Sequence, residues 1–207
     1  MIDQEQVLEI LHAIGEKITE EKLYLTELDN VIGDGDHGIN LARGFAEVEK
    51  KRPMMESKDI GTMLKTAGMA LVSTVGGASG PLYGTAFMQA GKALAGKTEL
   101  DAQDLLTILD AFVAGVQLRG KSVAGEKTML DAMIPARDAF KAALDAGKGA
   151  KDALADAVAA AEQGVEYTKT IIATKGRASY LGERSLGHQD PGATSFTTML
   201  KVAAAHV

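Results

Sequence analysis

Apolar residues recur along most of the chain at the three- and four-residue spacing that is typical of amphipathic helices. A first helix is predicted to begin after Asp3, a favourable N-cap residue, and to continue towards Leu28. A second helix is expected to open near Gly38 and to end at Pro53, because proline interrupts helical hydrogen bonding. Further helices are expected over residues 59–75, 83–94, 102–118, 130–144, 151–172 and 192–205. The pattern thus predicts about eight helices.

The composition supports a helical fold. Hydrophobic residues make up 46% of the chain and aromatic residues only 4%, and alanine-rich segments are common. Such sequences favour helices that pack through small side chains over strands, which prefer β-branched and aromatic residues. We therefore predict an all-α fold, with residues 1–207 forming one domain, because a chain of this length can enclose one substantial core.

Charge and cysteine content exclude several classes of function. The formal net charge is −6 and the basic residues do not gather into a stripe, so we expect no nucleic-acid binding. The chain has no cysteine, which excludes a disulfide framework and a cysteine zinc site. The acidic N-terminal segment is unlike a signal peptide, and no apolar run is long enough for a membrane span. We expect a soluble cytoplasmic protein without a membrane partner.

The segment Asp29–Asn40 holds the strongest chemical signal in the sequence. It reads DNVIGDGDHGIN and brings the carboxylates of Asp29, Asp34 and Asp36 into one short stretch. Carboxylates this close repel one another unless a cation lies between them, and an oxygen-only set of ligands suits Mg²⁺ or Ca²⁺. The intervening glycines allow sharp bends and a close approach of ligand to backbone. We interpret this segment as a site for a hard metal ion and phosphate.

An EF-hand beginning at Asp34 is excluded by the positions that follow. That motif needs a ligand at its fifth position, glycine at its sixth and glutamate at its twelfth, where this chain has Gly38, Ile39 and Phe45. A simple cap on the following helix is the other alternative, but a cap needs one aspartate rather than three.

Residues 91–98 formally match the Walker A pattern. A phosphate-binding loop of that kind follows a buried strand, whereas the residues before Gly91 are helix-like. We instead interpret these residues as a helix end at Gly96 followed by an N-cap near Thr98.

Two other glycine-rich connections could serve a phosphate site. Residues 75–81 offer free amide groups before a helix, which attract anions, but a tight joint between two helices would use the same residues. Residues 175–195 contain Lys175, Arg177, Arg184 and His188, and could equally form a solvated surface loop. The residues alone leave both alternatives open.

Four segments together resemble one protein family: GDGDHGINLARGF, GGASGPLYGT, RGKSVAGEKTMLD and KGRASYLGERSLGHQDPGATS. In this order and at this spacing they are similar to the ADP-binding L subunit (DhaL) of dihydroxyacetone kinases, over essentially the whole chain. The resemblance implies eight antiparallel helices that form a closed barrel, with a nucleotide held by the loops at one end.

The resemblance also implies roles for individual residues. Asp29, Asp34 and Asp36 are expected to be catalytic and to bind two Mg²⁺ ions, which would bridge the carboxylates and the nucleotide phosphates. The residues implied to bind ADP or ATP are His37, Gly38, Ile39, Asn40, Ala78, Ser79, Gly120, Thr128, Met129, Arg177, Asp190, Pro191 and Gly192. For Met129, packing in the core is an alternative that stays open.

By the same resemblance, the chain is expected to be a free-standing kinase subunit of the phosphotransferase-system type. Bound ADP would act as a coenzyme that a phosphohistidine protein phosphorylates, and the resulting ATP would phosphorylate dihydroxyacetone held on the K subunit. Two alternatives stay open: an L-type subunit of an ATP-dependent kinase for another short ketose or sugar alcohol, and a non-catalytic nucleotide-dependent protein that binds a regulator. The oligomeric state, including a homodimer, is not fixed by the sequence.

Overall fold

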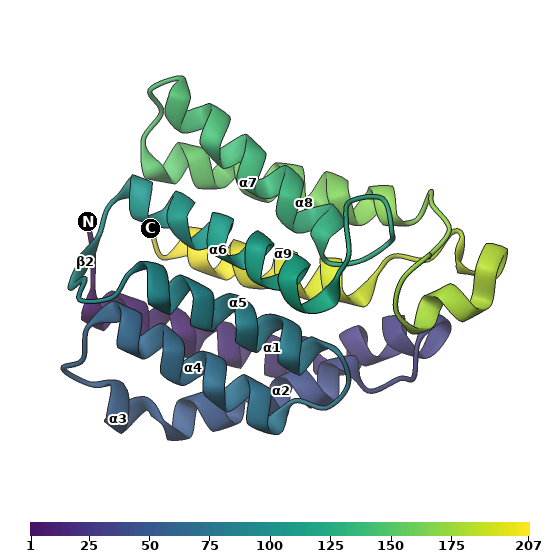
Figure 1. Ribbon diagram of the computed structural model, residues 1–207, viewed down its shortest axis with the longest axis horizontal. Coiled ribbons are helices and arrows are strands. Elements are labelled where there is room, and N and C mark those ends of the chain that lie inside the picture. The colour runs from purple at the N-terminus through teal and green to yellow at the C-terminus, as the bar shows by residue number, and fades with distance from the viewer.

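The computed structural model describes residues 1–207, and helices provide nearly all of its regular structure (Figure 1). The long helices are α1 (Gln4–Ile32), α2 (His37–Lys50), α4 (Ile60–Thr74), α5 (Ser79–Ala93), α6 (Ala102–Gly120), α7 (Leu130–Asp145), α8 (Ala150–Thr168) and α9 (Pro191–Ala205). The shorter elements are α3 (Arg52–Met55), the 3₁₀ segment η1 (Arg177–Ser185) and two antiparallel strands, β1 (Ile2–Asp3) and β2 (Glu99–Leu100). The all-α prediction is confirmed. None of these helices combines the length and the apolar character that crossing a lipid bilayer requires.

Side-chain caps set where several helices begin. Asp3 caps α1 as predicted, and its carboxylate accepts a hydrogen bond from the Gln6 amide at 2.9 Å. Asp101 caps α6, so the predicted N-cap near Thr98 is wrong. Asp190 caps α9 at the end of the longest connection. Each cap satisfies an amide group that would otherwise lack a partner in the first turn.

Several helix boundaries differ from the expectation drawn from periodicity. The second helix ends at Lys50, and Pro53 lies in the first turn of α3 instead of stopping α2. The first helix runs past Leu28 to Ile32, which places part of the acidic segment on a helix. Helix α5 begins at Ser79 rather than at residue 83, because Pro81 lies in the first turn, where a proline is tolerated. Helix α8 ends at Thr168 rather than at residue 172, and the chain then enters the long connection to α9.

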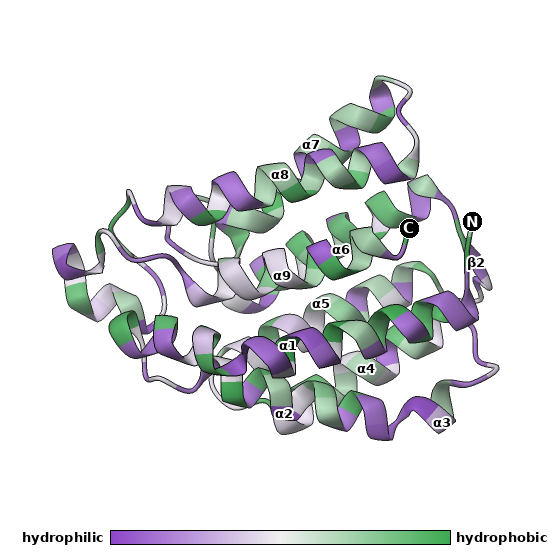
Figure 2. Ribbon diagram, turned by 180° about the vertical axis from the view of Figure 1, so that it is seen from behind, coloured by the Kyte–Doolittle hydropathy of each residue, from purple (hydrophilic) through white to green (hydrophobic).

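The long helices pack in sequence order around one core. Each packs against the next one along the chain, with α2 meeting α4, and α9 packs against α1, α7 and α8. A cluster of 46 buried residues, drawn from all the long helices, fills the space between them. Figure 2 shows apolar and polar residues alternating along the helices, as expected for helices that face a core on one side. Their enclosure as a closed barrel stays a prediction.

Because neighbouring helices run antiparallel, alternate connections meet at the same end of the molecule. The connections after α1, α4, α6 and α8 gather at one end, whereas both chain termini lie toward the other (Figure 1). The four segments singled out in the sequence fall on or beside these four connections. The fold therefore assembles one loop-rich end from distant parts of the chain.

Close helix packing depends on glycine between α4 and α5. A Cβ atom on Gly68 would lie 2.6 Å from the carbonyl oxygen of Gly84, and one on Gly91 would lie 2.4 Å from that of Gly61. Both distances are shorter than a real Cβ contact. The packing of helices through small side chains, expected from the composition, is thus present at this interface.

Candidate metal centre and its pocket

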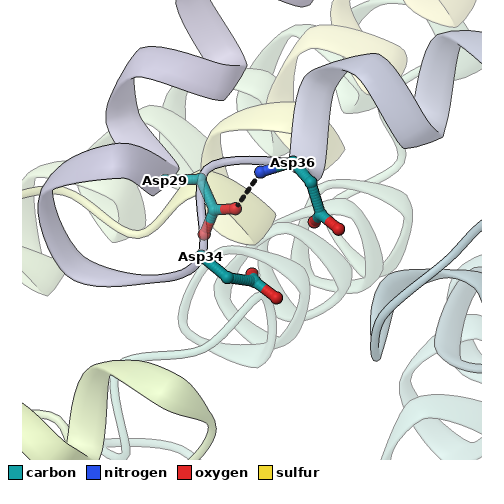
Figure 3. Close-up of side chains that lie close together, drawn as sticks. All are labelled: Asp29, Asp34 and Asp36. Carbon is teal, nitrogen blue, oxygen red and sulfur yellow. Dashed lines mark hydrogen bonds between the residues drawn. The ribbon is translucent and has the colours of Figure 1, made fainter.

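The carboxylates of Asp29, Asp34 and Asp36 converge where α1 meets α2 (Figure 3). Asp29 lies in the last turn of α1, Asp34 lies in the connection, and Asp36 immediately precedes α2. One oxygen of each lies within 4.8 Å of the others, a span that small cations with ligand distances of about 2.1 Å can bridge. Asp29 is buried, Asp36 is half-buried and Asp34 is exposed, so the cluster opens to solvent beside Asp34.

Two backbone amides fix the carboxylate of Asp29. Its Oδ2 atom accepts hydrogen bonds from the amide of Asp36 at 3.0 Å, drawn in Figure 3, and from the amide of His37 at 3.1 Å. These amides stand at the N-terminal end of α2, where the helix dipole stabilises negative charge. The second oxygen, Oδ1, accepts no hydrogen bond within the chain and is free to bind a cation.

The path of the connection requires Gly33 and Gly35. A Cβ atom at residue 33 would lie 2.0 Å from Asp29 Oδ1, and one at residue 35 would lie 1.9 Å from Asn30 Oδ1. Gly35 also has a φ of +73°, which side chains disfavour. These glycines let the chain turn tightly enough to bring Asp34 and Asp36 back beside Asp29.

The cluster carries more negative charge than nearby basic groups neutralise. Arg177 is its one ion-pair partner, with Nε lying 2.7 Å from Asp34 Oδ2. The imidazole of His37 adds no compensating positive charge, because burial lowers its pKa. The three aspartates act on this pKa in the opposite direction but have the smaller effect. A net negative, oxygen-only set of ligands fits a hard divalent cation such as Mg²⁺ or Ca²⁺.

The cluster forms one wall of a pocket with a volume of about 480 Å³, a size that suits a small molecule. All four connections at this end contribute to its lining. The predicted site residues that line it are Asp29, Asp34, Asp36, His37, Ala78, Ser79, Gly120, Thr128, Met129, Arg177, Asp190, Pro191 and Gly192. The fold thus brings together residues from across the whole sequence.

Three predicted site residues, Gly38, Ile39 and Asn40, lie outside the pocket lining. Gly38 packs against α1, where a Cβ atom would lie 2.0 Å from the carbonyl oxygen of Lys22. The Ile39 side chain is exposed, and Asn40 is buried beside Gly76 of the connection between α4 and α5. Gly38 and Asn40 therefore hold the neighbouring segments together, and their contact with a nucleotide stays a prediction.

Groups that attract anions line the rest of the pocket. Arg119, Lys127, Lys175 and Arg177 all contribute to its wall. Helix α5 begins at Ser79 with no side-chain cap, so the amides of its first turn are available to a ligand. Carboxylates on one side and cations with free amides on the other suit a polyphosphate that carries a divalent metal.

Lys127 lines the pocket but was not singled out from the sequence. Its side chain is 1% exposed, and Nζ donates hydrogen bonds to the carbonyl oxygens of Thr168 and His188 at 2.5 Å each and of Ile171 at 3.4 Å. Burial lowers the pKa of its ammonium group, an effect that Asp190 opposes. Its position next to Thr128, in a segment already linked to the nucleotide, is the one signal that could have identified it.

Asp190 is the N-cap of α9 and contributes to the wall of the pocket. Its carboxylate accepts a hydrogen bond from the Ala193 amide at 2.7 Å, and its own amide donates to Thr168 Oγ1 at 2.9 Å. Burial raises the pKa of the carboxyl group to about 7; repulsion from Asp131 and Asp29 acts in the same direction. Near neutral pH this group therefore carries only part of its negative charge.

Comparison with known proteins adds an independent line of support. The family model described as the DAK2 domain matches residues 31–205. An ADP-binding subunit of PEP-dependent dihydroxyacetone kinase 1 from Listeria innocua is 49% identical over 93% of this chain and 91% of its own length. The corresponding subunit from Escherichia coli is 43% identical over 98% of this chain and 97% of its own length.

A solved structure shares the fold. The dihydroxyacetone kinase of C. freundii, crystallised with AMP-PNP and Mg²⁺, matches 96% of this chain with a TM-score of 0.71 and 26% sequence identity. The match covers 33% of the solved chain, so this protein spans about a third of that kinase's length.

Proposed function

The chain belongs to the DAK2 domain family of kinase subunits, and on that premise we propose that it is the ADP-binding subunit of a PEP-dependent dihydroxyacetone kinase. The observation that carries the proposal is the convergence of three aspartate oxygens within 4.8 Å in the wall of an anion-attracting pocket. The L subunits it resembles over nearly their full length are named for binding ADP. We also propose that residues 1–207 act as one nucleotide-binding domain.

Asp29, Asp34 and Asp36 would hold one or two Mg²⁺ ions, which neutralise charge on the phosphates and on a phosphoryl group in transfer. The nucleotide, when bound, supplies a β-phosphate that accepts a phosphoryl group from a phosphohistidine protein and later yields it to dihydroxyacetone on the K subunit. Binding and orienting the nucleotide are the roles of side chains and backbone amides of this chain.

Those groups bind and orient the phosphates. Arg119, Lys175 and the amides at the start of α5 attract their negative charge, and Ser79 adds a hydroxyl group. Arg177 lies on η1, pairs with Asp34 and lines the pocket. Its guanidinium group is therefore close enough to contact a phosphate bound beside the metal. Gly120 and Met129 line the wall on which the rest of the nucleotide would lie.

The position of the pocket indicates how partners would approach. It opens among the connections at one end of the molecule, whereas the second main pocket is lined only by hydrophobic residues. We propose that the K subunit and the phosphohistidine donor dock in turn over this end, since each must reach the same phosphoryl group.

A reconstituted transfer assay tests this proposal. The D34A/D36A double variant should lose both nucleotide retention and the PEP-dependent phosphorylation of dihydroxyacetone in the presence of the partner chains. A control variant, D138A/D152A, removes the same charge from exposed helix positions outside the pocket and should transfer normally. Near-normal transfer by D34A/D36A would refute the assignment of the aspartate cluster as the metal and nucleotide site. Nucleotide binding by the wild type without any turnover would favour the non-catalytic alternative.

A further inference from the structure

A chain of buried hydrogen bonds runs behind His37. The imidazole Nε2 atom lies 2.9 Å from Ser195 Oγ on α9, which in turn lies 2.7 Å from the hydroxyl of Tyr83 on α5. The carbonyl oxygen of Gly192 accepts from Tyr83 and from Ser195, at 3.1 Å in each case. Tyr83 and Ser195 are both 0% exposed, and neither lines the pocket.

Counting the hydrogens in this hydrogen-bond network indicates which ring nitrogen of His37 carries the proton. Ser195 and Tyr83 have one hydroxyl hydrogen each. If one hydroxyl donates to the Gly192 carbonyl and the other makes the bond between the two hydroxyls, no hydroxyl hydrogen remains for His37. The bond to His37 must then be donated by Nε2–H. With the proton on Nδ1, Ser195 must donate to His37, and the Tyr83 hydrogen can then serve either Ser195 Oγ or the Gly192 carbonyl but not both, so this alternative makes one hydrogen bond fewer.

We propose that Tyr83 and Ser195 are positioning residues of the metal site, which hold the neutral His37 ring with its proton on Nε2. His37 lines the pocket, so the unprotonated Nδ1 is the ring atom left to accept a hydrogen bond there, as from water bound to the metal ion. This deepens the proposed function and rests on it.

The same network also supports a metal ligand through the backbone. The His37 amide donates to Asp29 Oδ2 at 3.1 Å, so the residue whose ring is anchored by Ser195 also orients the buried carboxylate of the cluster. The network connects α2, α5 and α9, which supply three sides of the pocket. Loss of the Ser195 hydroxyl would therefore release the His37 ring and loosen one contact that holds Asp29.

Histidine NMR on nucleotide-free protein tests the network directly. The chain has four histidines, and a His37→Asn variant identifies the signal of interest among ¹⁵N-labelled rings. Above the ordinary histidine pKa of about 6.5, wild-type His37 should show the Nε2–H tautomer. Ser195→Ala and Tyr83→Phe should each give the Nδ1–H tautomer or a mixture. Thr197→Val is the matched control, because Thr197 is buried on the same helix and its hydroxyl bonds only to the Ala193 carbonyl.

Metal dependence supplies the second readout. The Mg²⁺ concentration needed to retain ADP should rise about 10-fold or more in Ser195→Ala and stay unchanged in Thr197→Val. A wild-type Nδ1–H tautomer, or an unaltered tautomer in both network variants, would overturn the proposal. So would an altered tautomer with unaltered Mg²⁺ dependence. Failure of the wild type to bind ADP at all would instead refute the proposed function, because the NMR experiment needs no nucleotide.

Discussion

The buried ammonium group of Lys127 gives the sharpest prediction about what holds the site together. It binds three backbone carbonyls, one at the end of α8 and two in the connection to α9, and two of the bonds measure 2.5 Å. Hydrogen bonds from a charged donor contribute about 1.5–3 kcal/mol each, so the two short bonds give about 3–6 kcal/mol. Desolvation, which lowers the pKa of Lys127, offsets part of this sum. We expect Lys127→Met to cost about 3 kcal/mol.

Thermal unfolding of nucleotide-free protein measures this cost. For a chain of 207 residues each kcal/mol shifts the midpoint by about 2–4 °C, so Lys127→Met should unfold about 6–12 °C below the wild type. Lys141→Met is the control, because it removes an exposed ion pair with Asp145 that contributes at most about 0.5 kcal/mol. A Lys127→Met midpoint equal to that of the Lys141→Met protein would refute the anchoring role.

Two further predictions concern packing and charge around the pocket. Gly38→Ala should destabilise the protein strongly in denaturant unfolding, because its Cβ would lie 2.0 Å from the Lys22 carbonyl oxygen. Gly149→Ala, whose Cβ would meet nothing within 4 Å, should cost no more than the loss of a glycine N-cap on α8, about 1 kcal/mol. The raised pKa of Asp190 means that the folded protein holds this proton more tightly than the unfolded chain does, so its contribution to stability falls as pH rises from about 4 to about 7. Asp190→Asn keeps a capping side chain and should flatten that decline in pH-dependent urea unfolding; an identical slope would contradict the assigned pKa.

The helices could be predicted because their signals are local. Apolar spacing and the cap at Asp3 lie within a few residues of the helix that they specify. Helix boundaries were predicted wrongly where a local signal was ambiguous or where a residue distant in sequence contacts the helix end. Pro81 suggested a connection but lies in the first turn of α5, and the end of α8 is bound by Lys127, which is far away in sequence.

The aspartate cluster was equally accessible from sequence, because its three aspartates fall in one short segment whose glycines allow a tight turn. The roles of Lys127 and Ser195 could not be predicted from the sequence, because they depend on which helices become neighbours in the fold. A lysine in a loop is exposed in most proteins, and nothing in its immediate sequence shows that carbonyls from the end of α8 and from the following connection will surround it. Only the assembled fold places Tyr83 and Ser195 behind His37.

Nucleotide content tests the central claim, a nucleotide clamped by metal ions on the aspartate cluster, most directly. The protein is purified without added nucleotide, treated or not treated with EDTA, then denatured, and the released nucleotide is quantified. The account predicts nearly one ADP per chain in untreated protein and its loss after EDTA. Protein that retains no nucleotide and binds neither ADP nor ATP in the presence of Mg²⁺ would contradict the account, as would ADP that EDTA fails to release.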